Sequence, residues 1–341
     1  MKKNGEMAVR RPDDMHLHVR QGELMKVVVP QTAAVFKRAI IMPNILPPVT
    51  SAERLERYRE RVVAAAGSAS GFEPLMTFKI IPGLSPDVVQ ELKQAGALAG
   101  KLYPEGATTN SEDGVSDVQT IYPVLEEMQR NDIVLSIHGE DPDVFSLDRE
   151  EAFLPTLRQF SRDFPDLRIV LEHLSSAAAV QAVAELPNVW GTITLHHLEL
   201  TLDDLLGGEL QPHYFCKPIV KRPSDRAAIQ RAALSGSPKY FFGSDSAPHP
   251  VDRKHAPTAR AGIFSAPVAY QGLLRFFGEH DALERIEGFT AVYGADFYGV
   301  PKNGDELVVR RQDWTAPDEV GGLVPYHAGE VFPYTVIPGW K

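Results

Sequence analysis

The sequence predicts an α/β fold in which eight parallel strands close into a (β/α)8 barrel of the TIM type, with a short C-terminal extension. Short apolar or β-branched runs alternate with helical patterns along the chain, and eight such units fall within roughly 250 residues. No glycine-rich dinucleotide or phosphate-binding fingerprint of an open sheet occurs. Because strands that alternate with helices pair in parallel through right-handed crossovers, a closed barrel follows.

The predicted elements follow one another in a regular order. The first strand ends in HLHVR (16–20), and the second, RAIIMPN (38–44), precedes a helix over 51–66 in which Ser51 is the expected N-cap. Five further strands are predicted at 75–81, 97–104, 132–140, 168–173 and 188–197, and an eighth at 239–249. The helices between them start at Ser85-Pro86 or lie near 117–130, 148–162 and 176–186. Residues 303–341 indicate an appended tail with hairpin character, so we expect 1–341 to form a single barrel domain that carries this tail.

Composition narrows the class of protein. The 341 residues include 35 Lys and Arg against 45 Asp and Glu, a net charge of -10, with no run of basic residues that would bind nucleic acid. The first residues lack the apolar core of a signal peptide, and no apolar run approaches the ~18 residues of a membrane span. We therefore expect a cytoplasmic protein with neither nucleic-acid nor membrane partners. The single cysteine, Cys216, excludes an intrachain disulfide and a multi-cysteine zinc site.

Reactive side chains stand at the ends of the predicted strands, where a barrel of this kind assembles its active site. His16 and His18 share one face of an extended segment, because side chains alternate along a strand. Each such residue has a structural alternative: a core histidine that is merely hydrogen-bonded or, for Asp245, a helix N-cap. Their coincidence at one end of the barrel predicts a metal centre. Its candidate ligands are His16, His18, Lys101, His138, His173 and Asp245.

Lys101 is an unusual residue for a metal site, since an ammonium group cannot ligate a cation. Burial lowers the pKa of a lysine, and the neutral amine can react with carbon dioxide to form a carbamate, an anionic ligand with two oxygens. The alternative is a lysine that extends to solvent or forms an ion pair. The neighbouring histidines favour the carbamate.

Seven segments together resemble the dihydroorotases, in the shorter bacterial type within the amidohydrolase superfamily: RRPDDMHLHVRQG, MPNILPPVT, KLYPEGATTN, IHGE, LEHL, GSDSAPH and FYGVP. The resemblance covers nearly the whole chain. It implies that His16 and His18 bind one metal and His138 and His173 the other, that carboxylated Lys101 and a hydroxide bridge the two, and that Asp245 completes the first site and is the catalytic acid and base. Histidine-rich ligation favours zinc for both divalent ions.

The same resemblance implies a substrate site and a reaction. Arg20, Asn44 and His249 would bind a substrate carboxylate with backbone groups near Lys217 and Ala261, and a mobile loop would bring Thr108 and Thr109 over the substrate. The implied activity is the reversible cyclisation of N-carbamoyl-L-aspartate to L-dihydroorotate in pyrimidine (UMP) biosynthesis, and a homodimer is compatible with it. Two alternatives stay open: another cyclic amidohydrolase of the hydantoinase or allantoinase type, or a catalytically silent homologue that serves as a partner protein.

Two positions depart from the pattern of the family. Lys217 stands where an apolar residue is common, and we expect its side chain to point away from the chemistry because only main-chain groups are required there. The segment TLHHL (194–198) replaces the expected TPQHL, so His196 takes the place of a neutral amide. We expect His196 to lie behind the ligands or at the rim rather than to form a third metal position.

Overall fold

The predicted barrel is present in the computed structural model, which describes residues 6–67 and 70–338. Eight parallel strands follow one another in chain order around a single sheet. Backbone hydrogen bonds from Asp245 N to His16 O (2.9 Å) and from His18 N to Ser246 O (3.2 Å) join the last strand to the first and close the barrel. The strands are β2 (Asp13–Leu17), β3 (Arg38–Ile41), β4 (Glu73–Ile80), β5 (Ala97–Leu102), β6 (Val134–Ile137), β7 (Ile169–Leu171), β8 (Val189–Ile193) and β9 (Tyr240–Phe242).

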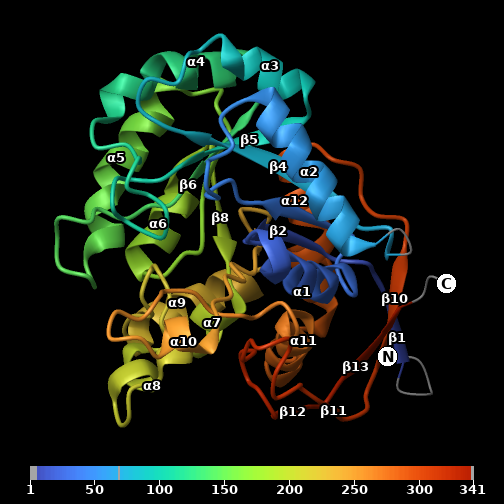
Figure 1. The fold of residues 1–341 in the computed structure, drawn as a ribbon. Coiled ribbons are helices and arrows are strands. Elements are labelled where there is room, and N and C mark those ends of the chain that lie inside the picture. Colours follow the sequence, from blue (N-terminus) through green and yellow to red (C-terminus); the bar gives the residue numbers. More distant parts are fainter. Residues whose placement is uncertain (1–5, 68–69, 339–341) are drawn as a thin grey trace.

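Helices lie between the strands and cover the outside of the barrel, and Figure 1 shows α2 to α6 as an arc around it. In α2 the predicted N-cap is confirmed, since the Ser51 side chain accepts a hydrogen bond from Arg54 N, and Leu55, Tyr58 and Val62 are its buried face. The helices are α1 (Gly22–Ala33), α2 (Ala52–Ala66), α3 (Val88–Gln94), α4 (Tyr122–Arg130), α5 (Arg149–Asp163), α6 (Ala177–Glu185), α7 (Leu195–Glu199), α8 (Leu202–Leu206), α9 (Pro223–Leu234), α10 (Val251–Lys254), α11 (Ala269–Glu279) and α12 (Tyr293–Tyr298). None of these helices is long and apolar enough to cross a membrane, so far as residues 6–67 and 70–338 are concerned.

Side chains fill the barrel interior, and α12 covers the end at which the strands begin. Phe241 of β9 packs against Phe297 and Tyr298 of α12, with ring centroids 5.3 and 6.2 Å apart. Arg38, the first residue of β3, donates a hydrogen bond to the carbonyl of Pro301, which follows α12 (2.7 Å). The N-terminal end of the barrel is therefore closed, which leaves the C-terminal end for a site.

The segment after α12 pairs with the start of the chain. Strand β10 (Glu306–Arg310) lies between β1 (Glu6–Arg10) and β13 (Thr335–Pro338) in an antiparallel sheet at the edge of the molecule (Figure 1). Strands β11 (Trp314–Thr315) and β12 (Val331–Phe332) form a second, two-stranded sheet. The predicted hairpin character of this region is present as the β11–β12 pair, whereas β1 was not predicted.

The strand predicted over 188–197 is wrong in its second half. Strand β8 ends at Ile193, and the helix α7 begins at Leu195, so His196 and His197 lie on a helix. The reason is local, because the Thr194 side chain accepts a hydrogen bond from His197 N (3.0 Å) and caps the new helix.

Candidate metal centre

The structure brings together the six side chains that we predicted as ligands, from positions at or just beyond the C-terminal ends of their strands. The first group of donor atoms is compact: His16 Nε2 lies 3.4 Å from His18 Nε2 and 3.4 Å from Asp245 Oδ1, and His18 Nε2 lies 3.2 Å from the same carboxylate oxygen. In a second group, His138 Nδ1 and His173 Nε2 are 3.1 Å apart. The rings of His16 and His173 have centroids 5.1 Å apart, so the two groups adjoin.

Buried oxygen atoms hold the outer ring nitrogens of three of these histidines. His16 Nδ1 lies 2.9 Å from Glu172, His18 Nδ1 lies 2.9 Å from the side-chain oxygen of Asn44, and His138 Nε2 lies 2.7 Å from Glu140. The outer nitrogen of each ring is the one that faces away from the grouped donor atoms, and an oxygen beside it fixes the ring proton there. The inner nitrogen then keeps its lone pair for a metal, and the contact orients the ring. Sequence reasoning missed Glu140 and Glu172. Glu140 is two residues from its partner His138 in the motif IHGE, whereas Glu172, in the motif LEHL, contacts the distant His16.

The charge states of the site suit metal binding. Burial lowers the pKa of His18 to about 4 and holds the pKa of His173 well below its usual value, so both imidazoles are neutral at pH 7 and keep a lone pair. Burial raises the pKa of the Asp245 carboxyl, but the hydrogen bond with His18 and the nearby imidazoles outweigh burial, and the pKa lies well below the ordinary range. Asp245 is therefore ionised.

Lys101 lies on β5 and is completely buried. No atom of the described residues accepts a hydrogen bond from its Nζ. Burial lowers the pKa of this amine to about 8, although the charges of Glu172 and Asp245 raise it. A buried amine with a lowered pKa and no partner fits the carbamate hypothesis better than the alternative of a lysine that extends to solvent.

The backbone at the site is tightly constrained. His173 and Asp245 both have a φ of 43°, a left-handed conformation that non-glycine residues seldom adopt and that costs of order 1–3 kcal/mol. His173 lies two residues after the end of β7, and Asp245 lies three residues after the end of β9. Gly243 is required beside them, because a Cβ there would lie 2.8 Å from the Cβ of His16.

A small cavity adjoins the ligands, and most of the predicted substrate-binding residues line it. Its free volume is about 20 Å³, room for little more than one water molecule. Sequence reasoning missed Tyr103, a fully buried neighbour of Lys101 that also lines the cavity. The predicted substrate-binding residues in the lining are Arg20, Asn44, Thr108, Thr109, Lys217 and Ala261.

His249 is placed differently from the other predicted substrate-binding residues. It is not among the lining residues of this cavity, and its Nε2 accepts a hydrogen bond from Arg20 Nη2 (3.0 Å). Arg20 also donates from Nε to the carbonyl of Pro248 (2.9 Å). Two fixed contacts hold the guanidinium, and further N–H groups of Arg20 stay available for a carboxylate.

The Lys217 side chain does not point away as we expected. Its Nζ donates a hydrogen bond to the carbonyl of Ala107 (2.7 Å), in the segment that carries Thr108 and Thr109. Asn44 Nδ2 donates to the carbonyl of Thr109 (3.1 Å) in the same segment. The flexible Lys217 side chain thus reaches the segment that carries Thr108 and Thr109. The family pattern, which requires only main-chain groups at this position, does not predict this contact.

Comparisons with known proteins show the family and the fold of the chain. Residues 31–268 match the family model described as Amidohydrolase. The chain is 46% identical over 338 residues to a dihydroorotase of Teredinibacter turnerae, covering 97% of this chain and 98% of that protein. The crystal structure of dihydroorotase in complex with 5-fluoroorotic acid from Saccharomyces cerevisiae superposes with a TM-score of 0.93 at 34% identity, covering 99% of this chain and 100% of that one. A dihydroorotase structure from Campylobacter jejuni gives 0.91 at 36% identity and 98% coverage of both chains. The chain belongs to the dihydroorotases of the amidohydrolase family.

Proposed function

We propose that the protein interconverts N-carbamoyl-L-aspartate and L-dihydroorotate, the cyclisation step of pyrimidine biosynthesis, at a centre of two divalent metal ions. The observation that carries the proposal is the convergence of four histidines, one aspartate and one unpartnered lysine at the open end of the barrel, in a chain that belongs to the dihydroorotases. It is a cyclic amide hydrolase by family.

The residues fit a pair of metal ions. His16, His18 and Asp245 form a three-ligand group, and the inner nitrogens of His138 and His173 offer two more ligands. Imidazole ligands favour zinc, and a carbamate on Lys101 would supply the oxygens that the second group lacks. Bound metals of this kind lower the pKa of water and polarise an amide carbonyl.

Asp245 is the residue we assign to proton transfer. In hydrolysis its carboxylate takes the proton from the attacking water and delivers it to the ring nitrogen as the amide bond breaks. In cyclisation it removes a proton from the ureido nitrogen that attacks the side-chain carboxyl group and passes this proton to the carboxyl oxygen, which takes a second proton from solvent and leaves as water. The ionised state of Asp245 and its position among the histidines support this assignment.

Arg20 and the loop 103–116 are the parts that we assign to substrate binding. Burial lowers the pKa of Arg20 to about 10, so its guanidinium stays charged at neutral pH and can hold a carboxylate through two parallel hydrogen bonds. Asn44, His249 and the backbone near Ala261 assist it. Because the free volume of the cavity is only about 20 Å³, we expect the loop to move as substrate enters and Thr108 and Thr109 then to close over it.

The decisive assay compares ring substrates and pH. Dihydroorotate should be hydrolysed and hydantoin and allantoin should not, and metal removal by a chelator should abolish turnover. Ring closure consumes one proton, since carbamoyl aspartate carries two carboxylates and dihydroorotate one. The equilibrium ratio of dihydroorotate to carbamoyl aspartate should therefore fall about tenfold per pH unit, or 1.4 kcal/mol, between about pH 6 and 8. Turnover of hydantoin or allantoin in preference to dihydroorotate would contradict the proposal, and absence of all turnover would favour a silent partner protein.

The last part of the proposal concerns the domain organisation, the oligomeric state and the location of the protein. We propose that 1–341 is one catalytic barrel domain with 303–341 as its tail, because β10 pairs with β1 and β13 pairs with β10, so the tail extends a sheet that begins with β1 rather than forming a core of its own. A homodimer and a cytoplasmic location stay predictions, which sedimentation and cell fractionation would test.

A further inference from the structure

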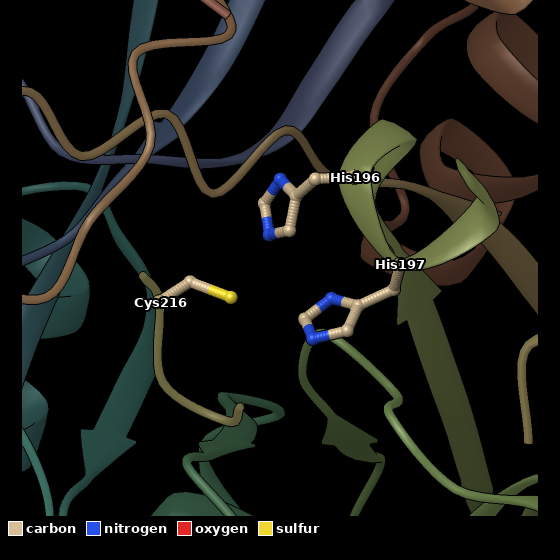
Figure 2. A group of neighbouring side chains, drawn as sticks. All are labelled: His196, His197 and Cys216. Carbon is tan, nitrogen blue, oxygen red and sulfur yellow. The ribbon is translucent and has the colours of Figure 1, made fainter. Parts of the chain in front are cut away.

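Outside the candidate metal centre, a second group of metal-binding side chains lies in the interior. His196 and His197 on α7 and Cys216, which follows the turn Pro212–Tyr214, are all at most 2% exposed. One ligand atom from each lies within 4.8 Å of the other two. Figure 2 shows the two imidazoles and the thiol pointing toward one common space. None of the three lines the cavity of the candidate metal centre.

His196 supplies an independent sign that this space takes a ligand. It is completely buried, yet neither of its ring nitrogens has a hydrogen-bond partner among the described residues. A neutral imidazole carries one N–H donor and one lone pair, and burying both without a partner is unfavourable. An ion that accepts the lone pair removes part of that penalty.

The contacts of His197 and Cys216 suit ligation. His197 Nε2 lies 3.0 Å from the carbonyl of Pro218, which only accepts, so Nε2 carries the hydrogen and Nδ1 the lone pair. This is the usual outer contact of a histidine bound to a metal. Nδ1 now accepts from the hydroxyl of Thr194 (2.9 Å), and the Cys216 thiol donates to Pro218 O (3.2 Å). Both are single neutral hydrogen bonds that a metal–ligand bond outweighs.

Contrary to our expectation from the sequence that His196 would not form a third metal position, we propose that His196, His197 and Cys216 form a separate binding site for one zinc-type divalent cation. In a tetrahedral site with one sulfur and two nitrogens, ligand atoms lie about 3.3–3.6 Å apart, so donors now within 4.8 Å reach it through rotations of side chains. On binding, the Cys216 thiol releases its proton to solvent and the sulfur bonds to the cation. A thiolate and two imidazoles are the ligands that zinc prefers.

The site would tie α7 to the segment that carries Lys217. Lys217 directly follows Cys216 and reaches Ala107 in the loop at the cavity mouth. On the other side, the buried Lys254 amine donates to the carbonyl of Phe215 (3.1 Å) and so positions the chain just before Cys216. A cation would therefore stiffen a segment that borders the substrate cavity. The inference does not depend on the proposed function, because no ligand of the candidate metal centre contains sulfur.

Cobalt substitution tests the site in the intact enzyme. Since Cys216 is the single cysteine of the chain, any sulfur-to-cobalt charge-transfer band in Co²⁺-loaded protein has to arise from this residue. We expect the band in the wild type, its loss in Cys216→Ser together with one metal equivalent per chain, and at least a tenfold weaker Co²⁺ affinity of this band in His196→Gln. As a matched control, His213→Ala removes one of two surface histidines whose Nε2 atoms are 3.1 Å apart, and it should leave the band unchanged.

Several results would overturn the proposal. Folded wild-type protein at saturating Co²⁺ that shows no such band would do so without any variant, even if Cys216→Ser failed to fold. Equal metal content in wild type and Cys216→Ser would do so as well, and would leave the space to water. A band unaffected by His196→Gln would remove His196 from the ligand set.

Discussion

Buried polar side chains on the strands are satisfied differently at the two ends of the barrel, although the Tyr298 hydroxyl of α12 at the N-terminal end also lacks a partner among the described residues. At the N-terminal end, Arg38 donates to both carboxylate oxygens of Asp13 (2.9 and 2.6 Å), and Asn303 donates to the same carboxylate (2.8 Å). Every partner in this network comes from the chain itself. At the C-terminal end, the buried Lys101 Nζ, Tyr103 hydroxyl and His173 Nδ1 have no partner among the described residues.

This difference separates structural from functional polar groups. A buried ion pair with complete hydrogen bonding needs nothing from outside, and losing one partner destabilises the fold. Buried groups without partners are unfavourable for folding and persist where a ligand satisfies them. The comparison predicts that substitutions at the C-terminal end remove activity and spare stability, whereas substitutions at the N-terminal end do the reverse.

The largest effect is expected for Lys101→Ala. Loss of the carbamate that we propose as a metal ligand should lower kcat/KM by more than about 10⁴-fold, or over 5 kcal/mol, with the unfolding free energy little changed. Steady-state assays and denaturant unfolding would measure both. Short-chain carboxylic acids with excess metal should restore a little activity by supplying two oxygens, while Lys101→Arg should not. Near-normal turnover with both metals retained would exclude the carbamate.

At the opposite end, Arg38→Met should chiefly affect stability. It leaves the fully buried Asp13 carboxylate without its cation, so the free energy of unfolding should fall by about 3–5 kcal/mol. The kcat/KM measured below the unfolding transition should stay within about twofold. Arg57→Met, an exposed arginine that pairs with Glu53 on α2, is the matched control and should change stability by about 0.5 kcal/mol or less. An equal loss of unfolding free energy in Arg38→Met and Arg57→Met would contradict the structural role that we assign to Arg38.

A smaller effect is expected from the loop over the cavity. Replacing both Thr108 and Thr109 by Val should lower turnover at least about tenfold, or 1.4 kcal/mol. The reason is the loss of two hydroxyls that, in our proposal, contact the bound substrate when the loop is closed. Metal content and stability should be unchanged. The loop should also resist protease when a product-like inhibitor is bound. Wild-type kinetics in the double variant would show that the two threonines of this loop have no role in binding the substrate.

Lys217→Leu tests a half-buried residue that lines the cavity at the C-terminal end and already has a partner within the chain. Removing the hydrogen bond to Ala107 O should weaken loop closure by about 1 kcal/mol and raise KM roughly fivefold, with kcat and metal content retained. A KM within twofold of the wild type would show that the loop closes without this lysine.

The smallest effect is expected at a partly exposed cluster that links the tail to the barrel. His327 lies between Glu199 (2.7 Å) and Glu330 (2.8 Å). Burial lowers the pKa of His327, but the two carboxylates outweigh burial and raise it above the usual value. The stabilisation is therefore complete below about pH 6.5 and is lost as the pH rises through the raised pKa. The difference in unfolding free energy between wild type and His327→Gln should shrink by about 1 kcal/mol between pH 6 and 9. A difference that grows with pH would reverse the assigned sign.

Several features could be predicted from the sequence alone. The alternation of strands and helices, the N-cap at Ser51 and the identity of His16 and His18 as neighbours all depend on short stretches of chain, where periodicity and residue chemistry are sufficient. The grouping of distant candidate ligands such as His138 and Asp245 followed from one further rule, that the ends of parallel strands meet at one face of a barrel.

Other features were decided only by the tertiary structure. The strand predicted over 188–197 ends early because Thr194 caps a helix, and the Lys217 amine finds Ala107, a partner 110 positions away in the chain. The approach of Cys216 to His196 likewise depends on how separate segments fold back over the barrel. Sequence patterns report the period and chemistry of one segment, whereas contacts between segments depend on closure of the whole barrel, which places each side chain by the packing of all the others.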